Sequence, residues 1–414
     1  MPKESRSDLH FTVAPPAGAS GIASWVLILV ITVVLGRLQE VIPGLAYLSL
    51  GKVAIGLAAL CYLLAPRRHQ FALFSFPQIK YLVYFTTLGF CVIPFSYWST
   101  GSFDFMLYRF GSSLLMTLLL IKLVGTYGEL RKIIWGIVLT LVILVGAALL
   151  TGEGRITASG TYDPNDLSLV IVTFLPLVYY MMLREAGGAK ILLLITTFAM
   201  IVAMLATQSR SGFVGFTVGL ICILIRERVN PLRLMVSGIV IVVMLYSFTP
   251  AGFLDRLTVV GTEGDYNMSA GGGRLEIWKR GLDLVFTHPI VGVGPGVFTV
   301  AEGTTHIDEQ SGTTGKWNTA HNSYLLVAGE FGLPGLILYL LVLSSTVRSV
   351  RRLRSSLPED SDLLWVVKGL EISLYSFMGG AFFLSQAFSA ALFLIIAISC
   401  SLEILSGNVA EGES

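Results

Sequence analysis

Three basic side chains stand where a polar segment meets a long apolar run, and each could act on an anionic substrate or its acceptor. Arg210 lies in the short polar turn "TQSRSG", Arg274 follows three glycines in "GGGRLEIWKR", and His321 lies in "TAHNSY", just before an apolar run. An arginine held beside apolar surface favours an anionic partner. A histidine has a pKa near neutrality, which suits a general base for a hydroxyl nucleophile. The three residues are therefore the candidates for catalysis.

The pattern after Gly273 predicts an amphipathic surface helix that begins at Arg274. At about 100° per residue, Arg274 and Trp278 fall on the apolar side. The charged side chains gather on the other side: Glu276, Lys279, Arg280 and Asp283. A helix start offers free N–H groups and a positive dipole, so Arg274 at this position suits a phosphate. The alternative is an arginine whose stem only covers lipid.

Further polar residues near these positions are candidates for substrate binding. The full set is Arg210, Arg274, Asn322, Trp278, Asn165 and Arg155. Asn322 could instead cap the following helix, and "DPND" around Asn165 could be a turn with a helix N-cap. The loop histidines His288, His306 and His321 lack short ligand spacing. We therefore predict no metal site and no cofactor.

The composition predicts a membrane protein built of helices. Of the 414 residues, 54% are hydrophobic and only 13% are charged, which is too little charge to cover a soluble protein of this length. Apolar runs of about 17–25 residues recur along the chain. We expect an all-α, polytopic transmembrane bundle of about twelve spans: 22–37, 43–65, 79–98, 104–125, 132–150, 165–183, 190–207, 211–225, 233–249, 322–346, 363–384 and 386–405.

The distribution of lysine and arginine predicts the orientation of the bundle. With a cytoplasmic N-terminus, the cytoplasmic turns and tail hold more than twice as many of these residues as the external turns. The expected organisation is a cytoplasmic tail (1–21), spans one to nine (22–249), a large external loop with short helices (250–321), three more spans (322–405) and a second cytoplasmic tail (406–414). Arg210, Arg274 and His321 then all lie on the external face.

Charges inside the expected spans need a partner or a cavity, because an isolated charge in the bilayer is costly. Lys52, Arg109 and Glu330 are such residues. Near Glu330, the sequence "GLPG" (332–335) should kink or break the tenth span.

Four sequence blocks together resemble the O-antigen ligase/polymerase superfamily of bacterial envelope glycosyltransferases. The blocks are "TYDPNDLSLVIVTFLPL", "TQSRSGFVGF", "GGRLEIWKRGLDLVFTHPIVGVGPGVF" and "AHNSYLLVAGEFGLPGLILYLLVL", in the order of that family, across about residues 150–345. The resemblance implies a GT-C-like, metal-independent, inverting enzyme of the bacterial inner membrane whose active site faces the periplasm. Its donor would be a glycan on undecaprenyl pyrophosphate. Arginines matching Arg210 and Arg274 would engage the pyrophosphate, and His321 would assist attack by the acceptor.

The acceptor stays open, as does one function of another class. A ligase would use lipid A-core, a polysaccharide polymerase another lipid-linked glycan, and a protein O-oligosaccharyltransferase a protein hydroxyl. We expect no nucleic-acid partner. The alternative class is a transporter of a small anion or lipid-linked sugar, which Lys52, Arg109 and Glu330 would favour if they lined one continuous path. No paired repeat supports that alternative.

Overall fold

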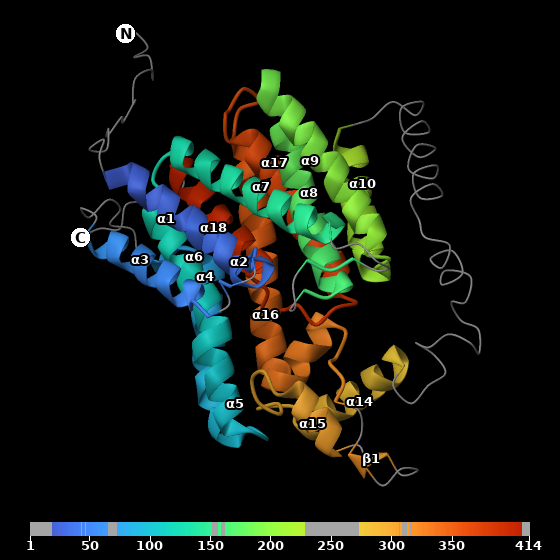
Figure 1. Ribbon diagram of the computed structural model, residues 1–414. Coiled ribbons are helices and arrows are strands. Elements are labelled where there is room, and N and C mark those ends of the chain that lie inside the picture. Colours follow the sequence, from blue (N-terminus) through green and yellow to red (C-terminus); the bar gives the residue numbers. More distant parts are fainter. Residues whose placement is uncertain are drawn as a thin grey trace, which may run out of the picture.

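The computed structural model describes residues 19–42, 44–45, 47–64, 73–150, 156–158, 162–227, 273–305, 307–308, 313–314 and 317–407. These residues form a bundle of α-helices (Figure 1). Apolar runs fold this way because a helix satisfies its own backbone hydrogen bonds, which a bilayer cannot do. The all-α prediction is confirmed, apart from one antiparallel pair of two-residue strands that the sequence did not predict, β1 (Ile307–Asp308) and β2 (Thr313–Thr314).

The helices differ widely in length. The longer ones are α1 (Ala19–Val34), α3 (Leu50–Leu64), α4 (Pro77–Val92), α6 (Gly111–Leu123), α7 (Tyr127–Leu150), α8 (Pro164–Arg184), α9 (Gly187–Ala206), α10 (Arg210–Arg226), α14 (Arg274–Thr287), α16 (Ser323–Ser356), α17 (Leu364–Ala381) and α18 (Ala390–Leu405). The shorter segments are α2 (Leu38–Val41), η1 (Leu73–Ser75), η2 (Ile93–Phe95), α5 (Ser99–Asp104), the π-helix η3 (Phe105–Phe110) and α15 (Phe298–Thr305).

Six helical stretches among the described residues are long and apolar enough to cross a membrane. Three shorter apolar helices accompany them: Gly21–Val34, Leu50–Leu64 and Ala390–Leu405. Every expected span overlaps a described helix except the ninth, 233–249, which lies outside the described residues. The protein is therefore a multi-pass membrane protein, and the number twelve stays a prediction.

Helix α16 ends later than expected, and it contains the expected break near its start. It continues ten residues beyond the predicted end at 346, because good helix formers such as arginine fill the stretch before Pro358. Inside the helix, Gly332 has φ 67° and ψ −173°, so the backbone is not helical there. The Leu333 N–H donates to the Pro289 carbonyl oxygen across 2.8 Å, which docks the segment before α15 onto this break.

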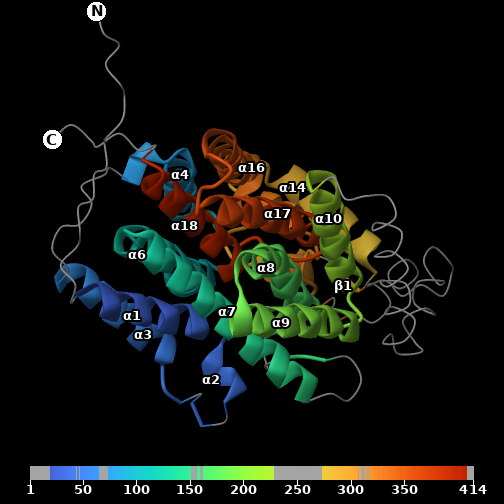
Figure 2. The same cartoon turned by 90° about the horizontal axis from the view of Figure 1, so that it is seen from above.

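The bundle has two rows of helices, with α6 and α8 between the rows (Figure 2). Seen from above, α17 and α18 lie on one side, α1, α7 and α9 lie on the other, and α6 and α8 lie between (Figure 2). The packing agrees with this view, because α8 contacts both α17 and α9, and α6 contacts both α18 and α1. Close approach of α10 to α17 requires Gly215, where an added Cβ would lie 2.9 Å from the Ser376 carbonyl oxygen.

One end of the bundle gathers the segments that the sequence analysis placed outside the cell. The Tyr97 N–H donates to the Val293 carbonyl oxygen across 3.0 Å, and the His321 N–H donates to Ser385 Oγ across 2.8 Å. Figure 1 shows α5, α14 and α15 together at this end, which we call the α14 end. The face of the membrane on which it lies stays a prediction.

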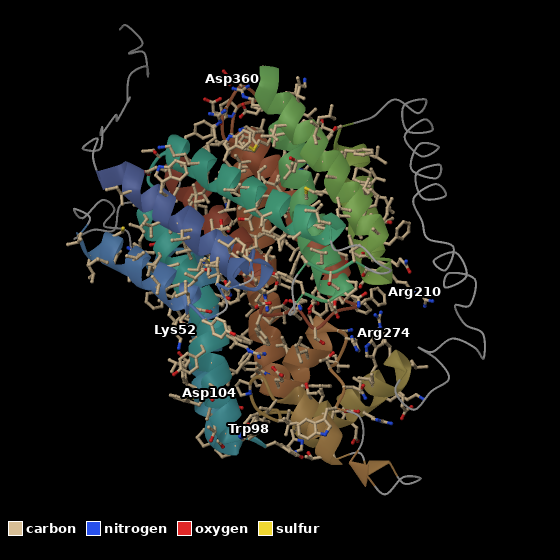
Figure 3. All side chains as sticks on the ribbon, viewed as in Figure 1. Lys52, Trp98, Asp104, Arg210, Arg274 and Asp360 are labelled. Carbon is tan, nitrogen blue, oxygen red and sulfur yellow. The ribbon has the colours of Figure 1, made fainter. Side chains whose placement is uncertain are left out.

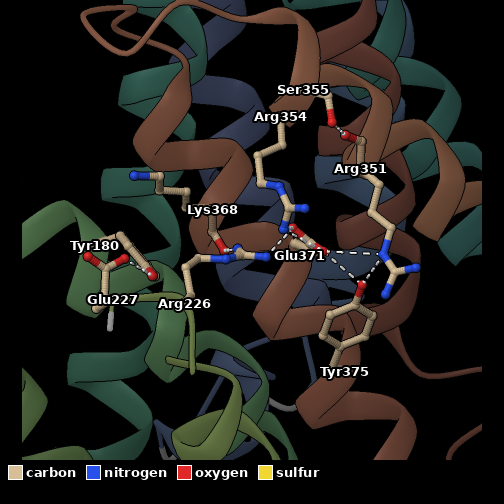
Figure 4. Close-up of polar contacts among 9 residues, drawn as sticks. All are labelled: Tyr180, Arg226, Glu227, Arg351, Arg354, Ser355, Lys368, Glu371 and Tyr375. Carbon is tan, nitrogen blue, oxygen red and sulfur yellow. Dashed lines mark hydrogen bonds and ion pairs between the residues drawn. The ribbon is translucent and has the colours of Figure 1, made fainter. Parts of the chain in front are cut away.

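The other end is held by a buried carboxylate, Glu371 on α17, and we call it the Glu371 end. Three arginines pair with Glu371: Arg226 of α10 and Arg351 and Arg354 of α16 (Figure 4). The Tyr375 hydroxyl also donates to Glu371 Oε1 across 2.8 Å. A carboxylate that accepts several charge-assisted bonds fixes the helices that donate them, so α10, α16 and α17 are tied together at this end.

Candidate functional site

Arg210 and Arg274 each occupy the first position of a helix at the α14 end. Arg210 begins α10 and Arg274 begins α14, and both side chains are half-buried. Figure 3 shows the two residues on the same side of the bundle, opposite Lys52. The Ser209 side chain caps α10 by accepting from the Gly212 N–H across 3.2 Å. The predicted helix start at Arg274 is confirmed, with Gly273 as its N-cap.

His321 lies close to Arg274, although 47 positions separate them in the chain. Burial lowers the pKa of the His321 imidazole, the Arg274 guanidinium lowers it further, and Asp163 partly opposes this. The ring is therefore held in its neutral form near pH 7, which is the form that can accept a proton.

The backbone of His321 is strained and held by neighbours. Its φ of 45° is left-handed, which is uncommon outside glycine. The Trp278 indole N–H donates to the Ala320 carbonyl oxygen across 3.0 Å, and the His321 N–H donates to Ser385. Trp278 also packs edge-on against Phe382, at 5.9 Å between ring centroids. Helix α14 and the turn before α18 thus fix the histidine from two sides.

Four helix N-termini meet around these residues: those of α8, α10, α14 and α16. The start of α8 lies beside that of α10, because a Cβ on Gly212 would lie 2.4 Å from Ser168 Oγ. Asp163, the N-cap of α8, is close enough to His321 to affect its pKa. Helix starts carry partial positive charge and free N–H groups, so the region favours an anion even before the arginines are counted.

Of the other candidate residues, two lie at helix starts and two lie outside the described residues. Asn322 caps α16, since its Oδ1 accepts from the Tyr324 and Leu325 N–H groups at 2.9 and 3.0 Å. Asn165 lies in the first turn of α8, where its own N–H donates to Asp163 Oδ1 across 2.7 Å. Arg155 and His306 lie outside the described residues.

His288 lies apart from the group around His321, and no metal cluster accompanies it. Its Nδ1 is 3.0 Å from Thr287 Oγ1, and its ring meets the edge of Tyr97. In the part of the chain that the structure describes, no group of three or more His, Cys, Asp or Glu side chains is arranged to hold a metal ion.

A large cavity lies beside the His321 segment at the α14 end, and only some of its residues could be predicted from the sequence. Its volume is about 1110 Å³, and Lys52, Arg109 and Glu330 all line it. Arg210, Arg274 and His321 do not line it, but Ser385, which holds the His321 N–H, does. We call it the polar cavity.

Tyr162 and Arg37, which the sequence analysis did not single out, form one wall of the polar cavity. The guanidinium carbon of Arg37 lies 4.8 Å from the centre of the Tyr162 ring. Burial raises the pKa of Tyr162 to about 12, against the opposing effect of Arg37, so its hydroxyl stays protonated and donates to the Leu35 carbonyl oxygen across 2.8 Å. More than a hundred positions separate the two residues in the chain, so no local sequence pattern could have predicted their contact.

Comparison with known proteins agrees with the resemblance of the sequence blocks. Residues 195–340 match the family described as O-antigen ligase, a segment that includes Arg210, Arg274 and His321 but neither Asn165 nor Arg155. A relative is the ComP-specific O-oligosaccharyltransferase of Acinetobacter baylyi (strain ATCC 33305 / BD413 / ADP1), 31% identical over 228 residues. The match covers 51% of this chain and 38% of the relative, so the chain spans well under half of the relative's length. These matches support the resemblance of the four sequence blocks to the O-antigen ligase superfamily.

Proposed function

We propose that this protein is a glycosyltransferase that moves a glycan from undecaprenyl pyrophosphate to an acceptor hydroxyl at the periplasmic face of the inner membrane, in lipopolysaccharide or exopolysaccharide assembly. One observation carries the proposal: Arg274, at a helix start, is close enough to a half-buried His321 to help lower the pKa of its imidazole, with further helix starts around them. An anion-binding group and a general base next to each other are what this transfer needs.

In the proposed reaction, Arg210 and Arg274 bind the pyrophosphate of the donor. A guanidinium forks onto phosphate oxygens, and its charge is strongest where the leaving group gains negative charge. His321 takes the proton of the acceptor hydroxyl as the acceptor oxygen bonds to the anomeric carbon. The bond from that carbon to the pyrophosphate oxygen breaks, undecaprenyl pyrophosphate leaves, and the anomeric configuration inverts. These steps require no metal ion.

The test is transfer by the purified protein from a lipid-linked glycan, with substitutions matched to controls of the same type. We expect His321→Ala, Arg274→Ala and Arg210→Ala to abolish transfer. His288→Ala and Lys279→Ala should retain it, since Lys279 points to solvent with 68% of its side chain exposed. Retained transfer in Arg274→Ala, or inhibition by EDTA that a divalent ion reverses, would contradict the mechanism.

The identity of the acceptor distinguishes three activities: ligase, polymerase and protein O-oligosaccharyltransferase. The relative's name, an O-oligosaccharyltransferase specific for ComP, favours a protein acceptor as a second candidate. A lipid A-core acceptor would identify a ligase, and a second lipid-linked glycan would identify a polymerase. The same assay therefore supplies all three acceptors in parallel, and the product that gains the glycan decides among them.

The transporter alternative has one observation in its favour, because Lys52, Arg109 and Glu330 line the same cavity. On α16, which has 34 residues, only Leu326 and Glu330 near its start line the cavity, so the cavity does not run the length of that helix. A cavity that does not run the length of the bundle is not a path across a membrane. Uptake of a solute into vesicles by the wild type, without glycan transfer to any acceptor, would favour the transporter.

A further inference from the structure

Three arginines near the end of α16 form an exposed, positively charged surface. Arg348, Arg351 and Arg352 are all exposed. At about 100° per residue, they fall within an arc of about 100° around the helix axis, whereas Val350 and Leu353 are buried on the other side. We call these three residues the arginine face.

In the part of the chain that the structure describes, the arginine face contacts one carboxylate, and two other arginines share it. Arg351 Nε lies 3.5 Å from Glu371 Oε1. The guanidinium groups of Arg226 and Arg354 lie closer, at 2.5 and 2.8 Å from Glu371 Oε2 (Figure 4). Three positive charges therefore surround one negative charge. Arg351 is the least buried of the three arginines, so it can also reach an anion outside the protein.

The other two members of the arginine face have no acidic partner among the described residues. Arg348 donates to a neutral group, Ser344 Oγ, across 3.4 Å. The next acidic residues in the chain, Glu359 and Asp360, follow the end of α16, and no ion pair among the described residues joins them to Arg348 or Arg352. The positive charge of the arginine face is therefore largely uncompensated by the protein itself.

The arginine face lies where α16 leaves the apolar part of the membrane. From Ser323 to Val347, Glu330 is the only charged residue in the sequence. The 34 residues of α16 extend about 51 Å at 1.5 Å per residue, which is more than the hydrocarbon core of about 30 Å. Figure 3 shows Asp360, just beyond α16, at the opposite end of the bundle from Arg274. With the apolar stretch in the core, the arginines therefore lie at the level of the lipid headgroups.

An exposed apolar stripe on α16 leads up to the arginine face. Leu333, Ile337 and Leu340 are all exposed. At about 100° per residue, they lie on the same side of the helix as the arginines. A ligand that follows this side of α16 meets apolar side chains first and guanidinium groups after them. This is the order of acyl chain and phosphate along a phospholipid, whereas a soluble anion would have no use for the apolar stripe.

We propose that the arginine face binds the phosphate of an anionic phospholipid, whose acyl chains lie along the apolar stripe of α16. Guanidinium groups fork onto phosphate oxygens, and basic groups beside transmembrane helices at the headgroup level suit anionic lipids. Positive charge that only orients the protein in the membrane would need no such arrangement on one side of one helix. The proposal does not depend on the proposed function, because it concerns the Glu371 end and requires no transfer.

The test compares the binding of two fluorescent lipids to the purified protein in a neutral detergent. Phosphatidylglycerol carries a net negative charge and phosphatidylcholine does not, and both probes have the same acyl chains. We expect the wild type to bind phosphatidylglycerol about a hundredfold more tightly, since each arginine near an anionic headgroup contributes about fivefold in affinity. Added salt should weaken this preference, because the arginines are exposed.

Substitutions then locate this preference on α16. The double variant Arg348→Gln with Arg352→Gln should lower the preference for phosphatidylglycerol about 25-fold, at about fivefold for each arginine. Both residues are exposed, and neither is among the described ion-pair partners of Glu371, so the ion pairs that hold the Glu371 end stay intact.

The matched control removes the same charge from other helices at the same end. Lys132 of α7 and Lys190 of α9 are exposed. Arg131, next to Lys132, pairs with Glu185 in the turn between α8 and α9, and a further ion pair joins the end of α8 to the segment before α17. We expect Lys132→Gln with Lys190→Gln to keep the preference of the wild type.

Four results would overturn the inference. Equal affinity of the wild type for the two lipids, or a preference that salt does not change, would show that the arginines bind no headgroup. An equal loss in the lysine control would show that only the overall charge of this end matters. Displacement of phosphatidylglycerol by an equal concentration of inorganic phosphate would show a site for a soluble anion. The first, second and fourth results come from the wild type, so they decide even if the double variant does not fold.

Discussion

Replacing Glu371 by glutamine should be the most destabilising single change at the Glu371 end. Glu371 is 2% exposed, and its three arginine partners differ in exposure: 14% for Arg226, 36% for Arg354 and 59% for Arg351. Removing one partner of a buried ion pair typically costs about 3–5 kcal/mol, whereas an exposed pair contributes about 0–1 kcal/mol. Because only Arg226 is well buried, we expect Glu371→Gln to cost about 3 kcal/mol.

The three arginine variants should follow the order of their burial. Arg226→Gln should cost about 1–2 kcal/mol, since Glu371 keeps its other partners, and Arg351→Gln should cost less than about 0.5 kcal/mol. The measurement is denaturant or thermal unfolding of each purified variant in the same detergent. Equal losses for Arg226→Gln and Arg351→Gln, or a loss below about 1 kcal/mol for Glu371→Gln, would refute this reasoning.

The same cluster bears on the site at the far end of α10. The helix has 17 residues, so Arg226 and Arg210 stand about 24 Å apart along its axis. A helix anchored at Arg226 and packed closely through Gly215 holds Arg210 at a fixed position. We therefore expect Glu371→Gln to lower transfer as well, and Arg351→Gln to leave it close to wild type.

Three further predictions concern the α14 end. The pKa of His321 lies below its ordinary value of 6.5, so the transfer rate should fall as the pH drops through that lowered pKa. The free energy of unfolding should fall over the same pH range, because the folded state resists protonation of His321. Since Arg274 lowers this pKa, Arg274→Gln should move the acid limb of the residual activity to higher pH. Gly332→Ala should lower the free energy of unfolding by about 2 kcal/mol, since Gly332 has φ 67° and a Cβ there would lie 2.6 Å from a backbone oxygen. The control is Gly146→Ala, whose Cβ would have no atom within 4 Å, and it should be neutral or stabilising. Trp278→Phe should cost about 1 kcal/mol through loss of the indole donor, and full stability with full activity in that variant would contradict its positioning role.

Features that depend on a few adjacent residues could be predicted from the sequence. Gly273 before an amphipathic pattern predicted the start of α14, and "GLPG" predicted the break in α16. Glu330 was expected to pair or line a cavity, and it lines one. In each case the cause is local, such as a missing Cβ, a missing N–H or a charge in an apolar run.

Features that depend on tertiary packing could not be predicted. The polar cavity joins Arg37 to Tyr162 and to Ser385, which no periodicity connects. The clustering of four helix starts also comes from packing. Each helix start can be predicted from its local sequence, but their closeness in space cannot. The end of α16 at Ser356, beyond the predicted 346, also follows from local sequence, since arginine is a good helix former.

The two ends of the bundle differ in backbone strain and in the contacts that hold their helices. Among the described residues, three that are not glycine have a left-handed φ: Arg37, Gln208 and His321. All three lie at the α14 end, in the wall of the polar cavity or next to the candidate catalytic residues, and such conformations cost about 1–3 kcal/mol each. The Glu371 end instead holds its helices with charge-assisted bonds. Strain persists only where surrounding contacts enforce it, and at His321 these contacts are the hydrogen bonds from Trp278 to Ala320 and from the His321 N–H to Ser385.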